Sequence, residues 1–165
     1  MQNSTSLEAK LNRLQDLEDI KTLRHRYAYE ANIIDGKSGN LKAFASLFAS
    51  DGTFDVGMGV ATGPAEIEKM MRALTTQWTC AMHYMLNPVI TLNGDRADGT
   101  FTGLFAFVSA KNPRPIWLSN IYSDTYVRTG EGWKFQSVRI RTTFASPEFA
   151  EAYAEHLAPP AASRQ

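Results

Sequence analysis

The sequence predicts an α+β fold in which helices come first and a run of long antiparallel strands follows. In the first part of the chain, apolar residues recur every three or four positions, which is the spacing of an amphipathic helix. In the second half, four segments are rich in β-branched and aromatic residues, and short hairpin-type connections containing Gly, Asn or Pro separate them. The predicted strands are 82–92, 97–110, 115–128 and 132–145.

The N-terminal helix is expected to start at a capping box formed by Thr5 and Glu8. Its apolar stripe is long, and it consists of Leu7, Leu11, Leu14, Leu17, Ile20, Leu23 and Tyr27. A helix that packs within one domain does not need a stripe of this length. Two explanations remain open: the first part packs against a partner chain, or the helix breaks near residues 16–17 into two.

The middle of the chain predicts three further elements. Residues 35–40 are rich in Gly and small polar residues and predict a loop, followed by a short amphipathic helix with Leu41, Phe44, Leu47 and Phe48 on one face. Residues 53–60 predict a strand weakened by its glycines, at an edge or a bend. Gly63-Pro64 then opens a helix that runs to about residue 77, because proline is favoured in the first helical turn.

Length and composition indicate one domain over residues 1–165, with its core at about 7–147 and a C-terminal tail at 148–165. In this tail, a short helical pattern of Phe149, Tyr153 and Leu157 precedes a segment that we expect to be disordered. No signal peptide and no membrane-length apolar run is found in the sequence, so we expect a soluble, cytoplasmic protein without a membrane partner.

Charge and motifs exclude several classes of function. Seventeen acidic and seventeen basic residues cancel, and without a long block of like charge no nucleic-acid partner is expected. A single cysteine excludes an intrachain disulfide framework and a cysteine-rich metal site. Neither a glycine-rich phosphate loop nor an HExxH motif is present. We therefore expect no metal and no cofactor, so that any chemistry must come from dispersed acid and base groups in a pocket.

His83 is the first candidate for such chemistry. It lies in an otherwise apolar strand segment, AMHYML, where a titratable imidazole costs free energy unless a partner or a ligand satisfies it. The alternative is a structural histidine that is hydrogen-bonded in the core.

Tyr27 and Asp35 are candidates near the end of the first helix. Tyr27 shares the apolar stripe, so its ring should face the core while its hydroxyl needs a partner. Asp35 follows two isoleucines, where apolar surroundings would raise the pKa of its carboxyl and suit it to proton transfer. The alternatives are a core tyrosine and a solvated turn residue.

The strands offer residues for a pocket wall. Alternation places Phe101, Phe105 and Phe107 on one sheet face, which suits either a core or an apolar ligand pocket. Trp78 and Met85 are expected to help set the pocket shape. On the last strand Arg139 and Arg141 are predicted to share a face with Trp133, Phe135 and Ser137, where an arginine binds an acidic group at the pocket mouth or forms a surface salt bridge.

These pieces together resemble the SnoaL-like branch of the NTF2-like superfamily, over roughly residues 17–147. The resemblance rests on the helix that carries Ile20, Leu23 and Tyr27 and ends at Asp35, and on four later segments. These segments read LFASDGTF at 47–54, GPAEI at 63–67, HYMLNPVITLNGDRA at 83–97 and SDTYVRTGEGWKF at 123–135. The fold implied is a cone, a strongly curved antiparallel sheet wrapped around N-terminal helices and enclosing one deep apolar pocket.

Within this branch the chain is similar to scytalone dehydratase, bile acid 7α-dehydratase and hexachlorocyclohexane dehydrochlorinase. The likeness implies a cofactor-independent lyase, or an isomerase, that abstracts a proton from a small, hydrophobic, cyclic substrate. His83 would be the general base, Asp35 its orienting carboxylate, and Tyr27 the group that polarises a carbonyl or assists the leaving oxygen. Trp78, Met85, Phe105 and Arg139 would contact the substrate.

Helix geometry complicates the choice of carboxylate. Tyr27 and Asp35 are eight residues apart, a rise of about 12 Å in a continuous helix. Either the helix ends early, or Glu30, which would also lie at the substrate, takes the carboxylate role.

Two other functions fit the same fold. Residues 29–35, YEANIID, are also similar to the β subunits of aromatic-ring dioxygenases, which are mainly structural partners of a catalytic chain. A non-catalytic ligand carrier is the third possibility. The resemblance further implies a homodimer or homotrimer, for which the outer sheet face around Trp117 would supply an interface.

Overall fold

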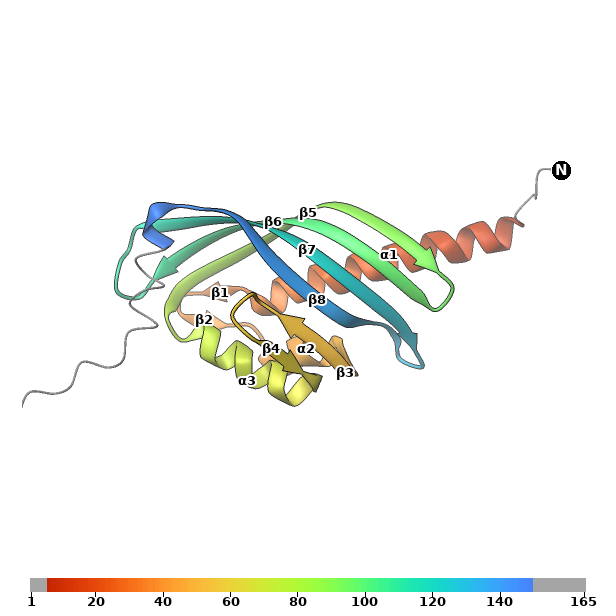
Figure 1. Ribbon diagram of the computed structural model, residues 1–165, viewed down its shortest axis with the longest axis horizontal. Helices are drawn as coiled ribbons and strands as arrows, with labels where there is room; N and C mark the ends of the chain where they lie inside the picture. The colour runs from red at the N-terminus through yellow and green to blue at the C-terminus, as the bar shows by residue number, and fades with distance from the viewer. Residues whose placement is uncertain (1–5, 150–165) are drawn as a thin grey trace, which may run out of the picture.

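The computed structural model describes residues 6–149 and confirms the α+β cone. One eight-stranded sheet curls over the helices, which lie on its concave side (Figure 1). The strand order is β2-β1-β5-β6-β7-β8-β3-β4, with β3 and β8 parallel and the other pairs antiparallel. Thr5 and residues 150–165, on which the predicted capping box and most of the predicted tail fall, lie outside the described residues.

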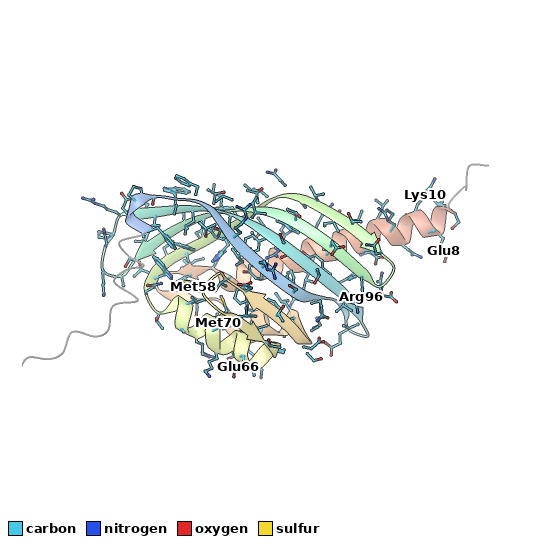
Figure 2. All side chains as sticks on the ribbon, in the orientation of Figure 1. Glu8, Lys10, Met58, Glu66, Met70 and Arg96 are labelled. Atoms are coloured by element: carbon cyan, nitrogen blue, oxygen red, sulfur yellow. The ribbon has the colours of Figure 1, made fainter. Side chains whose placement is uncertain are left out.

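Helix α1 (Leu7–Ala31) is continuous, so the predicted break near residues 16–17 is wrong. Its N-cap is Ser6, whose hydroxyl accepts a hydrogen bond from the backbone N–H of Ala9 at 3.1 Å. The first turns project beyond the strands, and Figure 2 shows Glu8 and Lys10 at this end. Leu7, Leu11 and Leu14 are exposed there. The partner chain that would cover these leucines stays a prediction.

Short elements follow α1. Strands β1 (Ile33–Ile34) and β2 (Lys37–Ser38) form a hairpin, and Asn40 caps helix α2 (Leu41–Ser46) through a 3.0 Å hydrogen bond from the N–H of Ala43 to its Oδ1. The region predicted as one weak strand at 53–60 forms two, β3 (Phe48–Asp55) and β4 (Val60–Thr62), because the chain turns around Gly57 with φ of 81°. Helix α3 (Gly63–Thr75) starts at the predicted proline.

Four long strands make up most of the sheet: β5 (Trp78–Asn93), β6 (Arg96–Ser109), β7 (Pro115–Thr129) and β8 (Gly132–Ala145). Each overlaps one predicted segment. Their inner faces pack on α1 through a cluster of aromatic rings, in which Tyr27 contacts Phe44, Phe54, Tyr122 and Phe135 at centroid distances of 4.7–6.2 Å. On the outer face Tyr84, Leu86, Trp117 and Phe144 are exposed, and the homo-oligomeric interface expected there stays a prediction.

A β-bulge in β8 changes which side chains face inward. Thr125 pairs with Ser137 while Tyr126 pairs with Phe135, so Gln136 is the extra residue. One extra residue reverses the alternation of faces. Phe135 and Val138 are therefore both fully buried, and Arg139 points outward. The prediction that one face runs from Trp133 through Arg139 is wrong for this reason.

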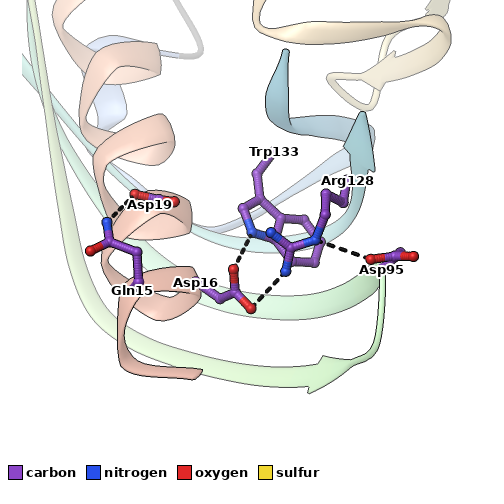
Figure 3. A network of polar contacts seen from close by, with 6 residues as sticks. All are labelled: Gln15, Asp16, Asp19, Asp95, Arg128 and Trp133. Atoms are coloured by element: carbon purple, nitrogen blue, oxygen red, sulfur yellow. Dashed lines mark hydrogen bonds and ion pairs between the residues drawn. The ribbon is translucent and has the colours of Figure 1, made fainter. Parts of the chain in front are cut away.

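A polar network joins α1 to the hairpin between β7 and β8 (Figure 3). The carboxylate of Asp16 accepts hydrogen bonds from Arg128 Nη2 at 2.6 Å and from Trp133 Nε1 at 3.1 Å, and Arg128 Nε donates to Asp95 at 3.0 Å. Although partial burial opposes the effect, the hydrogen bonds from Arg128 and Trp133 lower the pKa of Asp16. These contacts fix the register of α1 against the sheet, and thereby the position of the helix end that borders the pocket.

Candidate active site

A cavity of about 520 Å³ lies between the concave sheet face, the C-terminal end of α1 and α3. Most of its wall is aliphatic or aromatic, and a few polar side chains interrupt it, as in small-molecule sites generally. The lining includes Tyr27, Trp78, His83, Phe105, Asn120 and Tyr122. No aspartate or glutamate belongs to the lining within the described part of the chain.

His83 is held by Asn32 rather than by an acid. Asn32 Oδ1 lies 2.8 Å from the backbone nitrogen of His83 and 3.1 Å from its ring Nδ1. The backbone N–H can only donate, so the Asn32 atom facing it is the carbonyl oxygen, and that oxygen can only accept. Nδ1 must therefore carry the ring proton, which leaves Nε2 with a lone pair.

The surroundings of His83 keep its ring neutral. Burial, followed by the positive charge of Arg24, lowers the pKa of His83 to about 3. The ring meets Phe105 edge to face, with centroids 4.8 Å apart. Among residues 6–149 no group hydrogen-bonds Nε2, and His83 lines the cavity. The pocket thus contains a neutral imidazole with a fixed tautomer and an available acceptor.

Arg24 lies behind the pocket floor with its side chain completely buried. Its guanidinium is sandwiched by Tyr27 and Tyr122, 4.4 and 4.5 Å from the ring centroids, and it pairs with the buried carboxylate of Asp124. Burial alone would lower the pKa of Arg24, but the charge of Asp124 raises it, so the guanidinium stays charged. A fixed cation therefore lies against both tyrosines of the floor.

Tyr27 is one of these tyrosines, and its pKa is raised to about 12, chiefly by burial, with the positive charge of Arg24 opposing the rise. A hydroxyl with this pKa is a hydrogen-bond donor at neutral pH. Tyr122, also in the floor, has a raised pKa for the same first reason.

Residues 6–149 contain neither a metal-holding cluster nor a membrane-length apolar helix. No group of three or more His, Cys, Asp or Glu side chains gathers there in a way that could hold a metal ion. No helix in this part of the chain combines the length and the apolar character that a membrane span needs.

The family model of the SnoaL-like domain matches residues 12–139. The chain belongs to this family. Similar solved structures support the same fold. A scytalone dehydratase-like protein from Novosphingobium aromaticivorans is 23% identical, with a TM-score of 0.72 over 81% of this chain and 88% of the other. A hexachlorocyclohexane dehydrochlorinase from Novosphingobium barchaimii is 21% identical, with a TM-score of 0.74 over 84% and 93%.

A third structure, an NTF2-like protein with a cystatin-like fold from Novosphingobium aromaticivorans, is 25% identical. Its TM-score is 0.68 over 92% of this chain and 97% of the other. No curated protein matches the chain. At these identities the comparisons establish the fold of this SnoaL-like protein, and its chemistry depends on its own residues.

The predicted carboxylate partner of His83 is wrong on both alternatives. Asp35 is exposed at the tip of the β1–β2 hairpin, where Asp35 and Gly36 have φ of 51° and 71°. Such turns select Asp-Gly for its backbone conformation, which explains the aspartate without chemistry. Glu30 accepts a hydrogen bond from the N–H of Asn40 at 2.9 Å and lies outside the pocket lining.

Asn32 takes the place of the expected acid. It is the C-cap of α1 and lies five residues after Tyr27, so the helix does end early. The next residue, Ile33, pairs with Ala81 of β5, two positions before His83. This strand contact carries the Asn32 side chain to the histidine. No motif marks it, because an asparagine after a helix is equally typical of a cap.

Of the residues predicted to contact substrate, the structure brings Trp78 and Phe105 into the lining together with His83 and Tyr27. Trp78 stacks on Phe107 with centroids 4.9 Å apart. Met85 packs against the core and Arg139 lies outside the lining, whereas Arg141, the other arginine predicted at the pocket mouth, belongs to it. Arg139 Nε is instead 3.4 Å from Asp55 Oδ2, on the outer side to which the bulge directs it. Figure 2 shows Met58 and Met70, of which only Met58 lines the cavity.

Because Asp35 is a turn residue, Asp35→Asn is expected to have little effect on stability or on ligand binding. Asparagine also tolerates a positive φ, so the free energy of unfolding should change by less than about 0.5 kcal/mol. Asp35→Val, in contrast, places a β-branched residue at φ of 51° and should cost about 1 to 2 kcal/mol. Urea unfolding of the two variants measures both values. A loss of ligand binding in Asp35→Asn at unchanged stability would return this residue to the site.

Proposed function

We propose that this SnoaL-like protein is a cofactor-independent lyase that acts on a small, mostly apolar, cyclic molecule bound in the cavity. The observation that carries the proposal is the Nε2 lone pair of His83 in an apolar pocket, with the tautomer held by Asn32. A neutral imidazole in this form can accept a proton without first losing one.

In the proposed reaction, Nε2 takes a proton from a substrate carbon. The electrons of the broken C–H bond form a double bond to the neighbouring carbon, from which a hydroxide or halide departs with its electron pair. The Tyr27 hydroxyl, which stays protonated at neutral pH, can donate to the oxygen on which charge develops. If no group departs and the proton returns to another carbon, the same first step gives an isomerase.

The low pKa of His83 sets a condition on this chemistry. An imidazolium is costly in the empty pocket, so it must form beside a negative charge that the reaction itself creates. Elimination supplies such a charge, because the departing group is an anion. The names of the dehydratase-like and dehydrochlorinase structures denote eliminations, which supports this choice of reaction.

The test is turnover of a panel of hydroxylated cyclic ketones and chlorinated cyclohexanes. We expect His83→Gln to lower the rate for any converted member by about 100-fold or more, the usual contribution of a general base. His25→Gln is the matched control, because the side chain of His25 is exposed on α1 and does not line the cavity. Conversion by His83→Gln at the rate of the unmodified protein would refute the proposal.

Binding without turnover is the second candidate, and the neutral partner of His83 favours it. The amide of Asn32 orients the imidazole but offers no negative charge to stabilise an imidazolium. If panel members bind in the cavity and none is converted, the protein is a ligand carrier. In that case His83 is a hydrogen-bond acceptor for the ligand.

A further inference from the structure

Asn120 is a polar residue of the pocket that the proposed reaction does not use. It lies on β7 opposite Thr142 of β8 and Gly103 of β6, with 8% of its surface exposed. Its Oδ1 is buried without a hydrogen-bond partner in the described part of the chain. The residue lines the cavity together with His83. The unpaired oxygen therefore belongs to a buried carboxamide at the pocket wall.

Burial of the Asn120 Oδ1 without a hydrogen-bond donor costs free energy, which a ligand that donates to it would recover. A buried acceptor without a donor loses its hydration and gains nothing in return, whereas an apolar side chain of the same size would avoid the loss. Buried polar groups are nearly always paired, and an exception at a cavity wall indicates a partner that comes from the cavity. The hydroxyls of Tyr27 and Tyr122 are not donors to this oxygen, since no hydrogen bond joins either of them to Asn120 within residues 6–149.

The sheet register places Asn120 and His83 around one apolar platform. His83 is opposite Phe105, which is opposite Leu118, two residues before Asn120 on the same strand. Gly103, beside Asn120, lets the rings of Phe105 and Tyr122 pack directly over the backbone, since a Cβ there would lie 2.7 Å from the first ring and 2.8 Å from the second. A ring-sized ligand lying on Phe105 and Leu118 would therefore have His83 toward one edge and Asn120 toward the other.

We propose that Asn120 accepts a hydrogen bond from a hydroxyl group of the ligand. The substrate class of the pocket is then hydroxyl-bearing cyclic molecules, and halogenated or hydrocarbon rings without a hydroxyl are bound less well. This inference rests on the proposed function only in using the same cavity, because it concerns binding and requires no turnover.

Three naphthalene derivatives test the inference. 2-Naphthol donates a hydrogen bond, 2-methoxynaphthalene can only accept one, and 2-chloronaphthalene does neither to a comparable extent. We expect the protein to bind 2-naphthol about tenfold more tightly than either of the others, a difference of about 1.4 kcal/mol. Isothermal titration calorimetry gives the three dissociation constants.

Asn120→Leu should remove the preference and leave the affinity for 2-chloronaphthalene within about twofold. It should also raise the melting temperature, because it replaces an unpaired polar group by an apolar one; a residue with only a structural role would lower it. Binding of none of the three ligands overturns the inference. So does equal or tighter binding of the ether, or a preference for 2-naphthol that survives in Asn120→Leu.

The two proposals fail separately. An Asn120-dependent preference for 2-naphthol together with unimpaired turnover by His83→Gln removes the lyase proposal and leaves the inference standing. Loss of turnover in His83→Gln, without any effect of Asn120→Leu on the preference for 2-naphthol, removes the inference and leaves the lyase proposal standing.

Discussion

Replacing Asn32 by aspartate is expected to raise the pKa of His83 by about 2 to 3 units from its value of about 3. The two side chains have nearly the same shape, so the carboxylate can accept the same two hydrogen bonds from the backbone N–H and from Nδ1 of His83. The difference is charge. A carboxylate stabilises the imidazolium directly, whereas the amide of Asn32 stabilises it only through its dipole.

Histidine ring chemical shifts followed against pH by NMR give this pKa. Asn40→Asp is the matched control, because Asn40 caps α2 outside the pocket and the same chemical change there should leave His83 unaffected. A His83 titration that is the same in Asn32→Asp and in the unmodified protein would show that Asn32 Oδ1 is not its partner.

The substitution should also change the pH dependence of any reaction that uses His83 as a base. Only the neutral imidazole can accept a proton, and in the unmodified protein it stays neutral down to about pH 3. The rate should therefore not fall through titration of His83 as the pH drops from 8 to 5. In Asn32→Asp the rate should decline once the pH passes below the raised pKa, while rising at neutral pH as the base becomes stronger.

Stability provides an independent readout with a defined sign. The folded pKa of His83 lies below the value of about 6.5 expected in the unfolded chain. Between these values the unfolded chain binds the additional proton, so the free energy of unfolding falls as the pH drops from about 6.5 toward 3. Asn32→Asp raises the folded pKa of His83 and so shortens the pH interval over which stability falls. The variant should therefore lose less free energy of unfolding to His83 protonation than the unmodified protein does.

The histidine could be predicted from the sequence, and its partner could not, for a physical reason. A titratable group in an apolar strand is a local anomaly, visible in the residues around His83 alone. Its partner is set by the pairing of Ile33 with Ala81, a contact between segments 48 residues apart in the chain. The sequence around Asp35 contained the acid that chemistry would choose, but the backbone conformation of a tight turn explains that residue better.

The positions of the strands could also be predicted from nearby residues, whereas the bulge in β8 could not. Their positions follow from composition and turn residues, and the alternation along β6 correctly places Phe101 and Phe105 inward. Alternation fails in β8, where one extra residue at Gln136 sends Arg139 to the outer face. A bulge depends on how two strands pair, so a rule applied to one strand at a time cannot locate it.

Arg24 is the residue whose loss should destabilise the fold most. Its charge neutralises the carboxylate of Asp124, 100 residues away, to which the hydroxyl of Tyr126 also donates at 2.7 Å. Arg24→Met leaves that carboxylate buried without its counter-ion, which typically costs about 3 to 5 kcal/mol. Urea unfolding should show the loss, whereas Arg26→Met, at an exposed position two residues along α1, should change the free energy of unfolding by less than about 0.5 kcal/mol.

The reason for the loss can be tested by removing the partners as well. The triple variant Arg24→Met, Asp124→Leu, Tyr126→Phe removes both charges of the buried pair and the Tyr126 hydroxyl that donates to Asp124, so it should recover most of the stability lost in Arg24→Met. If it is no more stable than the single variant, packing of the guanidinium between Tyr27 and Tyr122, rather than its charge, holds the floor together.

The triple variant also separates the two causes of the low pKa of His83. Burial of the ring is the larger cause and remains, while the charge of Arg24, the second cause, is gone. The pKa of His83 should therefore rise only part of the way toward its ordinary value. A buried pair that stabilises the cone would then also tune the imidazole that borders the pocket, and fold stability and proton affinity at the candidate site would depend on the same guanidinium.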